Sequence, residues 1–290
     1  MPFAIRACMA AIGVLGTAAL WAAEPFVLVV MDPLSKPLSC DCVRGYAQRE
    51  YKLLAAHLER SLGREVKVVW FESLAEAIDE TAGKADLVIG KHSVVLADEK
   101  TTGYALTPIA QLTGKDGEVT QRGLIVVRKN DAAKTLSDLR GYRVLFGPPE
   151  AEEKSSAAEE SLLAAGVELP ETRQRHGACS EAATALLDFS DSVLAAAVIS
   201  SYAEPLLAGC GAIKKGDLRV VGETKPVPFV TAFVSEALDS AAQEQVLLSL
   251  ITAGTNPELL IGLETLAGFV PWSDASDRDD TLKKKTVANP

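Results

Sequence analysis

The sequence predicts an α/β protein with two lobes, between which the chain crosses twice. Continuous apolar runs, typical of strands buried on both faces of a sheet, alternate with segments of helical periodicity. The length of 290 residues suffices for two lobes of ordinary size. Strand-like stretches with turn residues mark the expected crossovers. We therefore assign residues 24–122 to the first part of lobe 1, 123–226 to lobe 2 and 227–270 to the return to lobe 1.

The N-terminus differs in composition from the rest of the chain. Arg6 precedes an apolar run over residues 10–21, which predicts a secretory signal peptide over residues 1–23. Leu20 or Trp21 occupies the position three residues before the cleavage site, where a small residue is preferred. A cleaved signal peptide and an uncleaved membrane anchor therefore both remain alternatives. We expect a protein of the periplasm or another extracytoplasmic compartment.

The overall composition argues against several classes of function. With 48% apolar and 23% charged residues, the chain is typical of soluble globular proteins. Its formal net charge of -10 argues against nucleic-acid binding, since nucleic-acid-binding surfaces are basic. The sequence has no nucleophile elbow, zinc-protease motif, P-loop or dinucleotide fingerprint. We expect a monomeric binding protein, not an enzyme, with no cofactor and no nucleic-acid partner.

The first part of lobe 1 is expected to begin with a strand over residues 26–31 that ends at Asp32. A loop rich in turn residues follows over residues 33–45, at the carboxyl end of that strand. The further elements expected are a helix over 46–62 closed by Gly63, a strand over 66–71, a helix opened by a capping box of Ser73 and Glu76 and ended by Gly83, a strand over 86–90, and strand-like segments over 108–112 and 124–127.

Lobe 2 is expected to begin with a strand over residues 142–146 and a proline-bearing turn. An Ala-rich helix of about four turns follows and ends near Ala165. The remaining elements expected are a helix over 180–189, strands over 195–199 and 218–221, and, after the return to lobe 1, a strand over 229–234 and helices over 239–253 and 257–267. The polar tail over residues 271–290 is expected to be disordered.

Polar residues follow the strands of both lobes. Lys91 and Ser93 follow the strand over residues 86–90, while Ser200, Ser201 and Tyr202 follow a strand of lobe 2. Ligands of open α/β sheets gather at the carboxyl ends of strands. We include Asp32, which ends the first strand, among the candidate ligand-binding residues for the same reason.

Three segments resemble a known family: the loop and helix around Tyr46, the strand over residues 86–90, and the Ser-Asp-Leu-Arg-Gly segment over 137–141 before a strand of lobe 2. With the order lobe 1, lobe 2, lobe 1 and an N-terminal signal, the chain resembles the type 2 periplasmic solute-binding proteins. The branch it resembles most binds phosphate, phosphite and phosphonate, and is related to sulfonate and transferrin-type binders. The resemblance covers about residues 25–269.

The resemblance implies a protein that closes by hinge motion around a small anionic ligand and delivers it to an ABC importer. In that family the ligand lies between the lobes and is held by hydroxyls and helix N-termini. The contacts implied here are Tyr46, Lys91, Ser93, Ser155, Ser156, Ser200, Ser201 and Tyr202. Lys154 adds a positive charge from lobe 2 that can act with Lys91 of lobe 1 on one anionic group.

The sequence departs from the family before the Ala-rich helix. Where phosphonate binders present a Ser/Thr-rich turn, Glu150, Glu152 and Glu153 precede Lys154 here. Carboxylates at a helix N-terminus already satisfy its dipole and repel a dianion. The expected ligand is therefore a small anion in general, either a phosphonate-, phosphite- or sulfonate-like oxyanion or an organic anion. Serines 155 and 156 face the cleft if the helix begins at Lys154, and lie a turn inside it if the helix begins earlier.

The cysteines raise an alternative function. Export favours disulfides, and we expect one between Cys179 and Cys210. Cys40 and Cys42 form a small-ring disulfide, bind a metal or stay inert, and His92 is a possible third metal ligand. The alternative is thus an exported metal-binding or thiol-redox accessory protein. A third possibility is an accessory protein that has lost ligand binding and docks onto a secreted partner.

Overall fold

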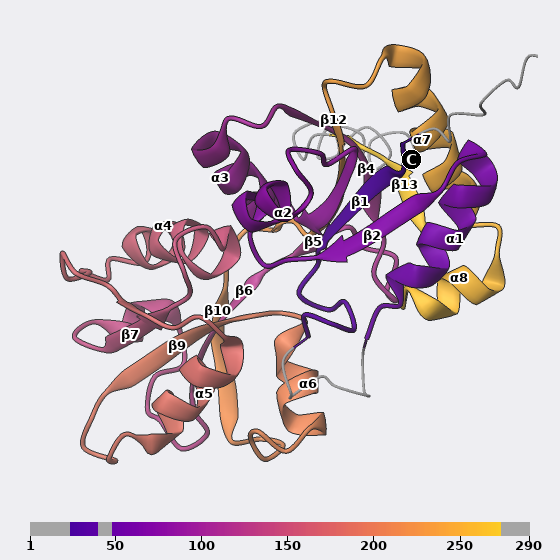
Figure 1. Cartoon of the computed structure of the whole chain (residues 1–290). Helices are drawn as coiled ribbons and strands as arrows, with labels where there is room; N and C mark the ends of the chain where they lie inside the picture. The colour runs from indigo at the N-terminus through magenta and orange to yellow at the C-terminus, as the bar shows by residue number, and fades with distance from the viewer. Residues whose placement is uncertain (1–23, 40–47, 274–290) are drawn as a thin grey trace, which may run out of the picture.

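The computed structural model describes residues 24–39 and 48–273. It has two lobes, each built around its own sheet (Figure 1). Lobe 1 contains the beginning and the end of the chain, coloured indigo, purple and yellow, and lobe 2 contains the middle, coloured pink to orange. This confirms the predicted α/β fold with two lobes. The expected signal peptide and residues 274–290 of the expected tail lie outside the described residues.

The sheet of lobe 1 has six strands in the order β13-β4-β12-β3-β1-β2. β1 pairs in parallel with β2 and β3, whereas β12 runs antiparallel to β3 and β4. Their bounds are Phe26–Met31 for β1, Val66–Trp70 for β2, Leu87–Lys91 for β3, Leu106–Leu112 for β4, Val230–Ser235 for β12 and Phe269–Pro271 for β13. β1 and β3 are buried along their whole length, as their continuous apolar runs predict.

Helices cover both faces of this sheet. The side chains of α1, α7 and α8 pack into one apolar cluster, and those of α2 and α3 into another. Their bounds are Tyr51–Leu62 for α1, Leu74–Glu80 for α2, His92–Thr102 for α3, Ser240–Ala253 for α7 and Pro257–Gly262 for α8. α1 ends at Gly63, whose φ of 64° is the left-handed conformation that glycine adopts without strain. No helix in the described part of the chain is both long and apolar enough to cross a membrane.

The sheet of lobe 2 has five strands in the order β10-β6-β9-β7-β8. β7 and β9 run parallel, and β6 is antiparallel to β9. The strands are β6 Gly123–Arg128, β7 Arg143–Phe146, β8 Gln174–Arg175, β9 Ala195–Ser200 and β10 Leu218–Glu223. The helical segments are the short turns η1 Leu136–Leu139 and η2 Glu152–Lys154, and the helices α4 Ser156–Ala164, α5 Cys179–Asp188 and α6 Ala203–Gly209.

A two-stranded ribbon joins the lobes. β5 (Thr120–Gln121) precedes β6, β11 (Val227–Pro228) follows β10, and the two short strands pair antiparallel. The chain thus leaves lobe 1 and returns to it side by side. The two connections between the lobes therefore lie at one place.

The helix expected after β7 is interrupted in the structure. The tight turn η2 is followed by Ser155, whose φ of -123° and ψ of -98° are not helical, and α4 begins only at Ser156. The capping box at Ser73 is not formed either, since the Ser73 side chain accepts no hydrogen bond from the first turn of α2; the N–H of Leu74 in that turn donates to Asp98 Oδ2 at 2.7 Å. Two helices, α3 and α6, had not been predicted. In α6 the third residue is Pro205, which a first helical turn tolerates but which reads as a loop residue in sequence.

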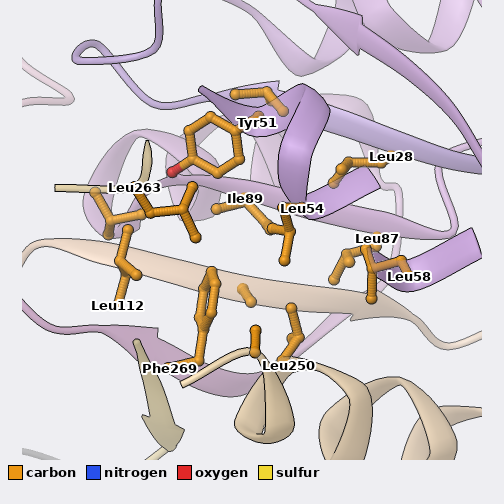
Figure 2. Close-up of a cluster of buried hydrophobic side chains, with 14 of the residues drawn as sticks. Leu28, Tyr51, Leu54, Leu58, Leu87, Ile89, Leu112, Leu250, Leu263 and Phe269 are labelled. Atoms are coloured by element: carbon orange, nitrogen blue, oxygen red, sulfur yellow. The ribbon is translucent and has the colours of Figure 1, made fainter. Parts of the chain in front are cut away.

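The core of lobe 1 lies between the sheet and helices α1, α7 and α8 (Figure 2). Leu54 on α1, Ile89 on β3 and Leu250 on α7 are fully buried there. Figure 2 shows their side chains converging with Tyr51 and Phe269 from opposite sides of the cluster. Lobe 1 therefore has an apolar core of its own.

Leu54→Ala is expected to lower the free energy of unfolding by about 2–5 kcal/mol, because it removes buried methyl groups and leaves a cavity. Urea unfolding followed by circular dichroism measures this difference. Leu248→Ala is the matched control, since the Leu248 side chain on α7 is 56% exposed. A loss as large for the control would contradict the assignment of Leu54 to the core.

Candidate functional site

A cleft of about 550 Å³ lies between the lobes. Both lobes contribute to its walls, which combine an apolar surface with a few charged side chains. Lobe 1 lines it with Met31, Pro33, Leu34, Leu38, Glu72, Lys91 and Val94, and lobe 2 with Pro148, Glu150, Ala151, Lys154, Gly177, Ala178, Cys179, Ser180, Glu181, Tyr202, Ala203, Leu206 and Leu207. This volume suits a small ligand.

Lys154 gives the cleft a positive charge. It is the last residue of η2 and is 5% exposed. Its side chain lies against Gly147, where a Cβ atom would be 2.5 Å from Lys154 Cβ, so a larger residue at 147 would displace the lysine. Within the described parts of the chain, the Lys154 amino group donates no hydrogen bond and forms no salt bridge. An amino group in the cleft wall without such a partner is available to an anionic ligand.

The first turn of α5 forms the facing wall. Residues 177–181 all line the cleft. The N–H groups of Gly177 and Ala178 donate to Glu181 Oε2 at 3.1 and 3.3 Å, which fixes the approach to the helix. N–H groups in the first turn of a helix have no partner within the helix and carry the positive end of its dipole. The wall thus offers hydrogen-bond donors near Lys154.

Lys91, by contrast, is already paired. Its Nζ atom lies 2.5 Å from Oε1 of Glu153, and Ser200 Oγ donates to the same oxygen at 2.6 Å. The side chain of Lys91 is 7% exposed and that of Glu153 is fully buried. Lys91 comes from lobe 1 and the other two residues from lobe 2. One carboxylate oxygen therefore joins the two lobes.

The charges around Glu153 keep it ionised. Burial raises the pKa of a carboxyl group, but Lys91, Lys154 and the Ser200 hydroxyl outweigh this effect and bring the pKa of Glu153 below its ordinary value. Burial lowers the pKa of Lys91, and the charge of Glu153 opposes that shift. The pair is thus a buried salt bridge whose partners depend on each other.

Ser93 holds the loop of Glu153 against lobe 1. Its hydroxyl donates to the carbonyl oxygen of Glu150 at 2.7 Å and accepts from the N–H of Glu152 at 3.2 Å. The backbone of Glu153 also approaches Gly123 so closely that a Cβ atom there would lie 2.0 Å from the Glu153 carbonyl oxygen. These contacts fix the direction in which the carboxylate of Glu153 points.

Asp32 has a structural role and does not line the cleft. Its carboxylate accepts hydrogen bonds from Arg49 Nη1 at 2.9 Å, from the Tyr51 hydroxyl at 2.6 Å and from the N–H of Leu34 at 2.9 Å. All of these groups are buried or nearly so. The prediction of Asp32 as a ligand contact is not supported by this geometry, because its oxygens are occupied.

Aromatic contacts extend this cluster to lobe 2. The guanidinium group of Arg49 lies over the Phe229 ring at 5.4 Å, and that ring stacks on Tyr202 with centroids 5.0 Å apart. Tyr202 also lines the cleft. Of the predicted contacts, the structure therefore brings Lys91, Lys154 and Tyr202 to the same cavity.

The other predicted serines are engaged elsewhere. Ser155 Oγ donates to the carbonyl oxygens of Pro149 and Ala151 at 2.8 and 2.9 Å. Ser156 is exposed at the start of α4 and does not line the cleft. Ser201 exchanges hydrogen bonds with the backbone of Arg122 next to the ribbon. Tyr46 lies outside the described residues.

The sequence analysis missed the first turn of α5 and the apolar residues of α6, which also line the cleft. It looked for ligand contacts only among residues directly after the strands that it predicted, since ligands gather at the carboxyl ends of strands.

The predicted disulfide between Cys179 and Cys210 is wrong for this structure, in which both are free thiols. Cys179 Sγ accepts from the N–H of Ser200 at 3.4 Å in the cleft wall, while Cys210 is exposed at the end of α6 and contacts the Leu207 carbonyl. The prediction relied on the two cysteines flanking one βα unit in the sequence, and this did not bring their thiols together in space. Cys40 and Cys42 lie outside the described residues.

The His92 side chain packs among aromatic rings of lobe 1. Its ring stacks on Phe233 and Trp272, with centroids 5.4 and 4.7 Å apart, and its Nδ1 lies 3.1 Å from Thr231 Oγ1. In residues 24–39 and 48–273, no group of three or more His, Cys, Asp or Glu side chains is arranged to hold a metal ion. The metal-binding alternative therefore gains no support from the structure.

Two lobes, a paired crossing ribbon and a cleft with charged groups from both sides define a periplasmic binding protein of the type 2 fold. The model of the family described as "ABC transporter, phosphonate, periplasmic substrate-binding protein" matches residues 46–279. The chain belongs to this family of substrate-binding transport components. A comparison with curated protein sequences found no match.

Solved structures with the same fold include several binding proteins. XAC2383 from Xanthomonas citri bound to ATP is 17% identical, with a TM-score of 0.65, and the match covers 90% of this chain and 95% of that one. PhnD1 from Prochlorococcus marinus in complex with methylphosphonate is 15% identical, with a TM-score of 0.62, and 92% and 99% are covered. A binding protein component of an ABC phosphonate transporter from Pseudomonas aeruginosa is 14% identical, with a TM-score of 0.64, and 90% and 87% are covered.

The salt bridge of Glu153 predicts a dependence of stability on acid pH. Because the pKa of Glu153 is lowered on folding, its contribution to stability is fully present above its ordinary value of 4.5 and is lost as the pH falls through the lower folded value. Below pH 4.5 we expect the free energy of unfolding to fall more steeply in the wild type than in Glu153→Gln. Urea titrations at a series of pH values measure both slopes. Equal slopes would show that folding does not lower the pKa of Glu153.

Proposed function

We propose that this protein is the extracytoplasmic solute receptor of an ABC importer, and that its cleft binds a small organic anion whose charged group lies between Lys154 and the first turn of α5. The lobes close over the ligand by bending at the ribbon of β5 and β11. The ligand class we propose is an alkyl phosphonate or alkyl sulfonate. Similar proteins with this fold include PhnD1, solved with methylphosphonate, and the aliphatic sulphonate binding protein SsuA from Escherichia coli.

The observation that carries this proposal is Lys154 in the cleft wall, whose amino group forms no hydrogen bond or salt bridge with the described residues. An anion in contact with this amino group gains a charge-assisted hydrogen bond. The N–H groups in the first turn of α5, which lines the same cleft, add donors for that anion. A ligand with one anionic group therefore has two independent reasons to bind here.

The other lining residues favour an anion of low charge with an apolar substituent. Glu72, Glu150 and Glu181 also line the cleft and repel a second negative charge. The aliphatic side chains of Met31, Leu34, Leu38, Val94, Leu206 and Leu207 line it as well. Burial of an alkyl group against such surface is favourable by about 0.8 kcal/mol per CH₂. Longer alkyl chains should thus bind more tightly than methyl, up to the size of the cleft.

Lys154→Gln is expected to weaken the binding of methylphosphonate, ethylphosphonate and ethanesulfonate by about 10–100-fold, because it removes a charged hydrogen bond. Isothermal titration calorimetry of the wild type and the variant gives the dissociation constants. Lys67→Gln is the matched control, since Lys67 on β2 is exposed and far from the cleft lining. Binding of none of these ligands by the wild type would refute the proposed ligand class.

Export and closure are tested separately from affinity. The N-terminal signal predicts that the full-length chain appears in the periplasmic fraction of a bacterial host with two membranes. Small-angle scattering of the monomer with and without a ligand that binds in the calorimeter reports any change in the separation of the lobes. Retention in the cytoplasm would contradict the role as an importer's receptor.

A further inference from the structure

The carboxylate of Glu153 has the surroundings of a bound anionic ligand. A lysine of lobe 1 and a hydroxyl of lobe 2 both donate to its Oε1 atom, at 2.5 and 2.6 Å. Charge-assisted bonds from opposite lobes to one oxygen are the arrangement by which a two-lobed protein holds an anion between its lobes. Here the anion is part of the chain itself.

The position of Glu153 is fixed by its backbone, so the carboxylate cannot simply swing away. Its carbonyl oxygen approaches Gly123, where only a glycine leaves enough room. Ser93 binds the preceding residues of the same loop. The other carboxylate oxygen, Oε2, is buried and accepts no hydrogen bond within the described residues. Lys91 and Ser200 thus hold the carboxylate of Glu153 through Oε1 only, and no described group donates to Oε2.

We propose that Glu153 is a specificity-determining residue beside the cleft: its buried negative charge, held by Lys91 and Ser200, compensates Lys91 and so excludes small dianions such as inorganic phosphate from the cleft. This proposal rests on the proposed function of the cleft and adds to it the reason why the anion binds at Lys154. With Glu153 in place, Lys91 has its charge compensated, and a second dianion nearby meets a buried negative charge.

Removal of this charge is expected to create a second anion subsite. In Glu153→Gln, Lys91 loses its only salt-bridge partner among the described residues and keeps the hydroxyl of Ser200 beside it. Lys91 and Lys154 line the same cleft, so both lysines can act on one dianion there. The amide of glutamine has nearly the shape of the carboxylate, so the cleft keeps its form and phosphate binds in the cleft beside the amide, where Lys91 and Lys154 line the wall.

Titration calorimetry with inorganic phosphate at slightly alkaline pH tests the proposal. We expect Glu153→Gln to bind phosphate at least ten-fold more tightly than the wild type, and the double variant Lys91→Gln, Glu153→Gln to lose that gain. Phosphate is also expected to raise the melting temperature of Glu153→Gln and not of the wild type, because a ligand that binds only the folded state stabilises it. Glu150→Gln is the matched control, since it removes a carboxylate from the same loop that lines the cleft without contacting Lys91.

Three results would overturn the proposal: no gain in phosphate affinity in Glu153→Gln, the same gain in Glu150→Gln, or a gain that survives loss of Lys91. If the wild type binds alkyl phosphonates or sulfonates while Glu153→Gln gains nothing for phosphate, this proposal fails and the proposed function stands. If Glu153→Gln gains affinity for phosphate while the wild type binds no organic anion, the role of Glu153 stands and the proposed function fails.

The double variant also provides a test if the single variant does not fold with Lys91 unpaired. It replaces a compensated pair by two neutral side chains of similar shape, which buried sites often accept. Since the proposal leaves Lys91 without a role in holding the organic anion, the double variant should bind that anion within about three-fold of the wild type. A loss of ten-fold or more would show that Lys91 contacts the ligand directly and would overturn the proposal.

Discussion

The buried salt bridge between Lys91 and Glu153 is the interaction on which the arrangement of the lobes depends. It joins the carboxyl end of β3 in lobe 1 to the turn η2 in lobe 2, and Ser200 at the end of β9 completes it. Two charges that have lost their water stabilise a fold only when they are matched and well placed. Once they are, any separation of the lobes must expose or unpair both charges. The salt bridge therefore favours a closed arrangement even in the absence of a ligand.

A second set of contacts acts in parallel and has a different character. Asp32 holds Arg49, Arg49 lies over Phe229, and Phe229 stacks on Tyr202 of lobe 2. This series of contacts therefore connects the salt bridge of Asp32 and Arg49 in lobe 1 to Tyr202 in lobe 2. Among the described residues, Lys91 of the cleft wall is held in a salt bridge, whereas Lys154 forms none. In the function that we propose, this difference between the two lysines gives the cleft its selectivity.

The fold was largely predictable from sequence, and the site was not. The unbroken apolar runs of β1 and β3, and the spacing of Tyr51, Leu54 and Leu58 on α1, carry the fold in local patterns that burial enforces. Lys91 and Lys154 were found because strand ends and helix starts are readable. The partner of Lys91 was not, because 62 residues separate it from Glu153 and only the closed arrangement of the lobes brings the two together. Pairing across lobes is a property of tertiary structure and leaves no local signal.

Leu206 of α6 is a member of the apolar cluster of lobe 1, although its helix belongs to lobe 2. Separation of the lobes would therefore bring aliphatic and aromatic surface into contact with water, in addition to breaking polar contacts. Exposure of apolar surface increases the heat capacity, and the free energy that opposes it becomes smaller on cooling. For the hinge motion that we propose, cooling is therefore expected to shift the balance toward the open form.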